Sequence, residues 1–290
     1  MTFYSNLNRS LAAALACLAV LPLSALPAAA HGVVGDRTFM EPLVAEDANP
    51  ANEFDVLAPS WQGGNFVEGI DIEKTLTRSI SLSLGGEWNG ATADAGPGFA
   101  NPEIALKGSV WRSEAHEGIV AIGLSASPPI GTPGLADTTW GLGPMVAFGK
   151  GFGDLPDSVG WVRPFALQGD LDADVPLDAT ADRDLHLNLA LSYSLPYLQQ
   201  EVTALGLPWP ISGVLPQVEV DLTQTVSGPD AGQFTGVALP GFAWIGSYNQ
   251  VSLAAMVPLN AQSGGYGVMA LLDLYLDDIF PTSYGQPLWR

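Results

Sequence analysis

The stretch Asp184-Leu-His-Leu-Asn-Leu-Ala-Leu-Ser-Tyr-Ser-Leu195 alternates bulky apolar residues with small or polar ones. Leucines occupy every second position from Leu185 to Leu191, and Tyr193 continues the series. A period of two residues places these groups on one face of an extended strand and the polar groups on the other. In a soluble sandwich the apolar face would meet a shared core, whereas in a membrane barrel it would meet lipid. Much of the chain repeats this pattern, so the fold depends on which environment the apolar faces meet.

Residues 1–30 have the features of a cleaved secretory signal. Arg9 is the only charged residue in this range, and Leu11–Leu26 is an apolar run. Ala28–Ala30 has the small-x-small form that signal peptidase accepts. Cleavage after this site would leave His31 as the first residue of the exported protein.

The composition is apolar for an exported protein. Hydrophobic residues make up 47% of the chain, and the mean hydropathy is +0.23. After residue 30 no run of about twenty apolar residues occurs, which excludes a transmembrane helix. A transmembrane barrel has this combination because its apolar residues occupy every second position of each strand. The single cysteine, Cys17, lies in the signal, so we expect no disulfide framework.

The charge balance is strongly acidic. Ten Lys and Arg stand against 30 Asp and Glu, which gives a formal net charge of −20. Nucleic-acid binding needs a basic surface, and this chain offers none. Asp170, Asp172 and Asp174 alternate but lack the glycine and the closing glutamate of an EF-hand loop. We therefore expect solvated loop acids at these positions, with no metal site and no cofactor.

The strand pattern divides the chain into three parts. Residues 1–30 are the signal peptide, residues 31–64 form an N-terminal extension or plug, and residues 65–290 form the barrel. We predict an all-β fold, an antiparallel transmembrane β-barrel of about ten to twelve strands, because single-chain bacterial barrels use even numbers. The last predicted strand runs to Phe280, and the tail Pro281–Arg290 either tucks against the rim or marks an unusual insertion signal.

Catalytic motifs are missing from the sequence. It contains no Gly-x-Ser-x-Gly elbow, no His-Glu-x-x-His and no glycine-rich phosphate loop, so we expect no enzyme. One alternative uses the imidazole and α-amine of an exposed N-terminal His31, which together can bind copper. A second histidine ligand would have to be His116 or His186. The alternative fold is accordingly a soluble exported β-sandwich that binds a ligand or copper.

Several short segments share a strand and turn pattern: Asn101-Pro-Glu-Ile-Ala-Leu-Lys-Gly-Ser-Val-Trp-Arg112, His116-Glu-Gly-Ile-Val-Ala-Ile-Gly-Leu124, Ile130-Gly-Thr-Pro-Gly134 and Trp161-Val-Arg-Pro-Phe-Ala-Leu-Gln-Gly-Asp170. Together they resemble the phenol meta-degradation pathway family of bacterial outer-membrane proteins. The resemblance implies a transporter-like barrel that passes small, often aromatic or hydrophobic, compounds. It implies no catalytic residue.

We predict a porin-like channel of the Gram-negative outer membrane. Its expected partners are outer-membrane lipid, the barrel insertion machinery and a small-molecule permeant. Polar residues on the face opposite the apolar groups are the candidates for the lumen: Asp273, Tyr275, Asp277, Glu219, Asp221, His186 and Asn188.

Overall fold

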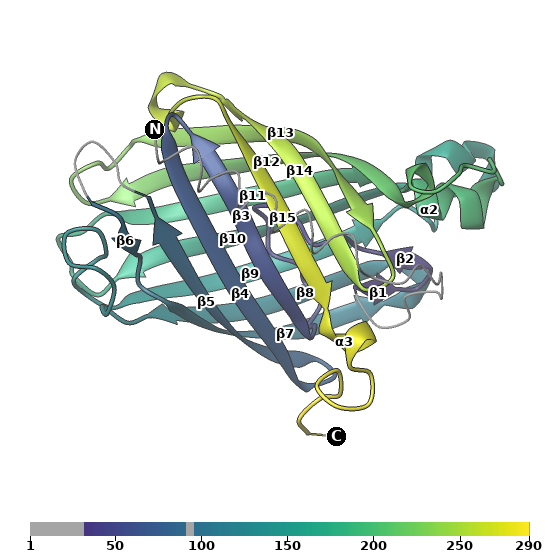
Figure 1. The fold of residues 1–290 in the computed structure, drawn as a ribbon, viewed down its shortest axis with the longest axis horizontal. Helices are drawn as coiled ribbons and strands as arrows, with labels where there is room; N and C mark the ends of the chain where they lie inside the picture. The colour runs from purple at the N-terminus through teal and green to yellow at the C-terminus, as the bar shows by residue number, and fades with distance from the viewer. Residues whose placement is uncertain (1–31, 91–95, 290) are drawn as a thin grey trace, which may run out of the picture.

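A computed structural model describes residues 32–90 and 96–289, and in this part of the chain twelve strands form a closed antiparallel barrel (Figure 1). Closure occurs where the last strand, β15, pairs with the first barrel strand, β3. The prediction of an all-β barrel with ten to twelve strands is therefore confirmed. The barrel strands are β3 (Glu53–Gln62), β4 (Asn65–Thr77), β5 (Ile80–Asn89), β7 (Glu103–Ser113), β8 (Gly118–Ser127), β9 (Gly141–Gly151), β10 (Phe165–Pro176), β11 (Arg183–Tyr193), β12 (Val214–Ser227), β13 (Phe234–Ile245), β14 (Asn249–Pro258) and β15 (Gly267–Tyr275).

The two ends of the barrel differ in what they carry. We call the end at which β3 begins and β15 ends the terminus rim, and the opposite end the far rim. None of the helices in the described residues is long and apolar enough to cross a membrane. The terminus rim carries η1 (Glu114–His116), η2 (Asp157–Val162), α2 (Leu195–Tyr197), η3 (Leu198–Val202), η4 (Ile211–Gly213) and α3 (Leu276–Ile279), and the far rim carries β6 (Gly98–Phe99) and η5 (Ala261–Ser263).

The apolar strand faces point outward. On β11, Leu185, Leu187 and Leu191 are exposed, whereas Ala190 and Ser192 on the other face are buried. The register aligns Leu187 with apolar neighbours on β10 and β12, so leucines form a band across adjacent strands. The sandwich alternative is wrong because these leucines lie on the outside of one closed sheet and do not meet in a shared core.

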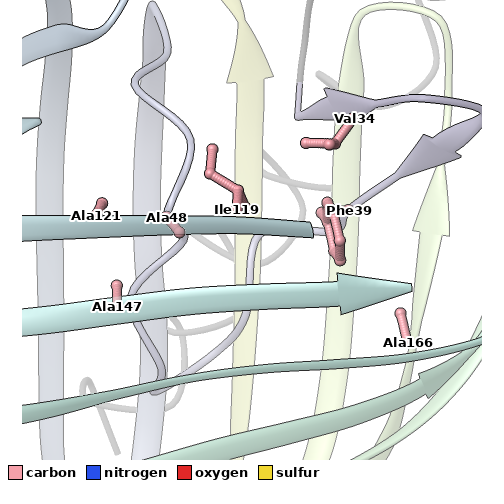
Figure 2. Packing of buried hydrophobic residues seen from close by; sticks show 7 residues of the cluster. All are labelled: Val34, Phe39, Ala48, Ile119, Ala121, Ala147 and Ala166. Atoms are coloured by element: carbon pink, nitrogen blue, oxygen red, sulfur yellow. The ribbon is translucent and has the colours of Figure 1, made fainter. Parts of the chain in front are cut away.

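Residues 32–52 run from the terminus rim into the barrel, and we call them the inner segment. The segment begins with a two-strand hairpin, β1 (Val33–Val34) and β2 (Arg37–Thr38). Figure 2 shows its residues Val34, Phe39 and Ala48 against small inward-facing side chains of the wall. A second buried cluster joins Leu43 to residues of β13, β14 and β15, and a third joins Met40 to β11, β12 and β13.

The expected boundary at residue 64 differs from the structure, in which the first barrel strand begins at Glu53. The alternation in this strand is interrupted because its pairing with β4 shifts register between Leu57 and Pro59. A proline within a strand also reads as a break in a sequence pattern. The extension inside the lumen is therefore shorter than expected.

The C-terminal tail tucks against the terminus rim. The amide of Trp289 donates to the carbonyl of Leu76 at 2.8 Å, next to the end of β4. Lys74 Nζ donates to the carbonyls of Tyr284 and Gln286 at 2.6 and 2.8 Å. The predicted strand to Phe280 is too long, because the chain turns into α3 after β15 ends.

Candidate functional site in the barrel lumen

Glu219 on β12 holds the middle of the inner segment. Its Oε2 accepts hydrogen bonds from the amides of Leu43 and Val44 at 2.9 and 3.0 Å. The side chain is fully buried, with 0% exposure. Amides that are buried without a partner are costly, so this one carboxyl group satisfies two groups that the irregular backbone of the segment leaves free.

Other side chains hold the inner segment from different parts of the wall. Each uses a carboxyl or amide group to bind the main chain of the segment. Asp170 Oδ1 accepts from the amide of Glu46 at 2.7 Å, and Glu73 Oε1 accepts from the amide of Ala51 at 2.8 Å. Gln168 Nε2 donates to the carbonyl of Met40 at 2.9 Å. Gln250 Oε1 accepts from the amide of Glu41 at 3.1 Å, and its Nε2 donates to the carbonyl of Glu41 at 2.6 Å. They come from β10, β4 and β14, so the segment lies across the lumen.

Lys107 on β7 is a buried cation inside the barrel. Its Nζ lies 2.7 Å from Glu46 Oε1 and 3.0 Å from Glu73 Oε2. It also donates to the carbonyl of Asp47 at 2.8 Å. A buried charge is tolerated when it is paired and hydrogen-bonded, so Lys107 is fully used in linking the inner segment to β4 and β7.

Arg37 anchors the inner segment at the terminus rim. The guanidinium Nε lies 3.2 Å from Glu117 Oε2, and Nη1 donates to the carbonyl of Pro164 at 3.0 Å. The same guanidinium lies over the ring of Tyr197, 3.8 Å from its centroid. Glu117 also accepts from the amide of Gly153 at 2.9 Å. Ion pairing, stacking and main-chain contacts thus converge on one arginine that is 1% exposed.

A cavity of about 740 Å³ lies beside the inner segment. It follows β5 from Ser81 to Glu87, a distance of roughly 20 Å at strand spacing. Small residues on β5, β7, β8 and β9 provide the room, and lining residues such as Ser127 and Gly141 lie near the far rim. Residues 41–46 of the inner segment form part of the lining, so the cavity runs between the segment and the wall.

The lining of this cavity is strongly acidic. Lys107 is its one basic residue among the described residues, and it is already paired with Glu46 and Glu73. Low-dielectric walls concentrate the field of such charges. The eleven acidic lining residues are Glu41, Glu46, Glu53, Asp55, Asp71, Glu73, Glu87, Glu103, Asp170, Asp172 and Asp174.

Three of the inward-facing aspartates lie in one row, which we call the acid row. Asp273 on β15 is paired with Asp55 on β3, and Asp55 is paired with Asp71 on β4. Directly paired residues have Cβ atoms about 4.5–5.5 Å apart, and like charges at such positions destabilise a sheet. The row continues to Gly85 on β5, which has no side chain.

The residues predicted for the lumen lie in different surroundings. Glu219, Asp273 and Tyr275 are buried. Asn188 lines the cavity and donates to Asp170 Oδ2 at 3.1 Å. Asp221 and His186 are half-buried, and His186 Nδ1 lies 3.0 Å from Thr223 Oγ1.

Asp277 belongs to α3 at the terminus rim and not to a strand. Its carboxyl group accepts from the amide of Asn52 at 3.4 Å and from the side chain of the same residue. It therefore helps to fix the point where the inner segment joins β3. The expected position in the last strand is wrong because β15 ends at Tyr275.

The expectation that Asp170, Asp172 and Asp174 lie in solvated loops is wrong. All three lie in β10 and line the cavity. Their two-residue spacing was the signal that placed them on one strand face. Among the described residues, no group of three or more His, Cys, Asp or Glu has a geometry that could hold a metal ion. The signal peptide and the copper-binding alternative at His31 lie outside the described residues.

Solved structures share this fold. An outer membrane channel from Pseudomonas putida F1 aligns with 79% of this chain and 97% of its own, at 12% identity and a TM-score of 0.52. The NanC porin aligns with 77% of this chain and 98% of its own, at 5% identity and a TM-score of 0.50. The chain shares the β-barrel fold of these outer-membrane proteins. No protein-family model and no curated protein sequence matches the chain.

Proposed function

We propose that this protein is a channel of the Gram-negative outer membrane that passes small solutes, prefers cations and catalyses no reaction. The observation that carries the proposal is an acidic cavity along the inside of a closed barrel whose outside is apolar. Rings and rows of carboxyl groups favour cations and oppose anions in a narrow pore. The inner segment narrows the lumen and leaves the passage beside β5.

The outer surface supports a membrane location. Exposed isoleucines and leucines cover the wall, including Ile70, Leu124 and Leu171. Trp111 near the terminus rim and Trp140 near the far rim are both about half exposed, at 50% and 49%. Aromatic residues at both ends of an apolar band are typical of barrels that sit between two lipid interfaces. The proposal includes export through a cleaved signal, and insertion by the cell's barrel machinery.

Aromatic or hydrophobic permeants are a second candidate, which follows from the resemblance to the phenol meta-pathway family. The favouring observation is that Met145 and Met269 line the same cavity as the acids. Methionine offers a soft, polarisable surface to aromatic rings. A cationic solute with an apolar body would use both parts of the lining.

Liposome swelling tests this proposal. Full-length protein in vesicles is exposed to solutes of similar size, namely a monovalent amine, a sugar, a carboxylate and phenol. We expect faster entry of the amine than of the carboxylate because the cavity is acidic. Equal entry of amine and carboxylate would contradict the cation preference, and no entry of any solute would contradict the channel.

Cell fractionation tests the location separately. The protein should remain in the outer-membrane pellet after an alkaline wash, and its gel mobility should change on boiling, because a closed barrel resists detergent until it is heated. Recovery of the unboiled protein in the periplasmic fraction would contradict the membrane location.

A further inference from the structure

Asp55 stands out among the acids of the cavity. Its side chain is 4% exposed and lines the cavity, and its Oδ1 accepts no hydrogen bond from a described residue. Its other neighbours are acids, since it is paired with Asp273 on one side and with Asp71 on the other. The carboxyl group shares a side-chain hydrogen bond with Asp273, which leaves only Oδ1 without a donor. A buried carboxyl oxygen without a donor is unfavourable, so this position favours a positive partner.

The cations of the described chain do not meet this need. Lys107 is directed to Glu46, Glu73 and the carbonyl of Asp47. On β5, the position where a Cβ of Gly85 would stand lies 3.0 Å from Asp71 Oδ2, so the missing side chain makes room for the Asp71 carboxyl group. Asp55, Asp71 and Gly85 all line the cavity. Asp55 and Asp71 therefore meet the cavity beside β5.

We propose that Asp55 and Asp71 bind the ammonium group of a small organic amine that enters the cavity from the far rim. An ammonium group has three N–H donors and forms short, charge-assisted bonds with carboxylates. Small-molecule sites commonly measure about 300–1,000 Å³, and the cavity of about 740 Å³ lies in this range. Met269 in the same lining offers an apolar contact for the carbon chain of the amine.

A metal ion fits these residues less well. No group of three or more potential ligands converges with the geometry of a metal site in the described residues. Divalent metals need several oxygens within about 2.0–2.6 Å, whereas an ammonium group accepts the wider spacing of paired strands. A proton shared between Asp55 and Asp273 is the other way to relieve the repulsion, and the experiment below separates it from amine binding.

The inference deepens the proposed function, because it names a solute class for the same lumen. It is tested by calorimetric titration of the full-length protein in detergent, which does not depend on conduction. The probe is putrescine, which carries two ammonium groups, and its uncharged counterpart is 1,4-butanediol. We expect saturable binding of putrescine and none of butanediol. Asp55→Asn should weaken putrescine binding by at least about tenfold, as expected for loss of a charged hydrogen bond.

Asp157→Asn is the matched control, because Asp157 is exposed at the terminus rim and should leave binding unchanged. Asp71→Asn provides a second variant, and the heat-dependent gel mobility of each variant shows that its barrel is folded. Absence of putrescine binding, equal binding of butanediol, unchanged binding by folded Asp55→Asn, or full displacement of putrescine by equimolar magnesium would each overturn the proposal. Binding without conductance in bilayers would uphold the site and refute the channel, whereas conductance without binding would do the reverse.

Discussion

Adjacent residues on β11 meet opposite environments. Leu189 lies on the face that carries the outward leucines, whereas Asn188 lines the cavity beside Asp170. We expect Leu189→Arg to reduce the free energy of unfolding by about 2–4 kcal/mol, because the charge would lie near the middle of the lipid. Asn188→Arg should be tolerated, because it faces carboxyl groups. Urea unfolding in lipid vesicles measures both, and equal losses would contradict the assignment of the two faces.

Two arginine–glutamate pairs differ in burial, and we therefore expect them to contribute differently to the free energy of unfolding. Arg37→Met leaves the buried Glu117 without its ion pair, which should cost about 3–5 kcal/mol. Arg112→Met breaks a pair with Glu114 that is largely exposed, at 42% and 61%, and removes a hydrogen bond to the carbonyl of Val33, so it should cost about 1–2 kcal/mol. The same unfolding measurement compares them. A loss for Arg37→Met no larger than that for Arg112→Met would show that the anchor contributes little.

Single residues were predictable from the sequence where alternation was regular. The pattern put Glu219 and Asp273 on polar strand faces, and both are buried inside the barrel. It could not identify Asp55, because the register shift that follows in β3 hides the alternation. Nor could it show that Lys107 pairs with Glu46, since the two are 61 residues apart and meet only when the inner segment enters the lumen.

At the scale of elements, the docking of the inner segment should depend on pH. Burial raises the pKa of Asp47 from 3.8 to about 6, although the nearby Lys107 opposes the shift. The carboxyl group of Asp47 therefore binds a proton more tightly when the inner segment is docked in the lumen than when the segment is released into solvent. Docking should be strongest below about pH 4 and should weaken as pH rises through about 6.

Limited proteolysis at pH 5 and pH 7.5, normalised to cleavage of an unfolded substrate, measures this change. We expect faster cleavage within residues 39–52 at pH 7.5. Asp47→Asn should remove the part of the difference that Asp47 contributes. Equal normalised rates in the unmodified protein, or an undiminished difference in Asp47→Asn, would contradict this account.

Elements with a clear two-residue period, such as β11, were predictable, and their ends were less so. Residues 157–162 form η2, although Trp161 shares its parity with Phe165 and was expected in a strand. The chain similarly enters α3 after Tyr275, where the alternation of the sequence continues. In both places contacts at the rim determine the backbone conformation, and a two-residue period in the sequence cannot predict those contacts.

At the scale of the whole molecule, alternation and the lack of long apolar runs were sufficient to predict a barrel. They could not fix its closure, which depends on pairing between β15 and β3 across more than 200 residues. They also left two alternatives for the C-terminal tail, and the hydrogen bonds of Leu288 and Trp289 to the end of β4 select the tucked form. The internal surface becomes acidic only because closure brings β3, β4, β5, β7 and β10 around one cavity.

The reversal potential of the full-length protein in a planar bilayer, measured under a gradient of KCl, tests the central claim most directly. The account predicts a current whose reversal potential shifts toward the equilibrium potential of potassium, because carboxyl groups line the passage. A reversal potential at zero or shifted toward that of chloride would contradict it.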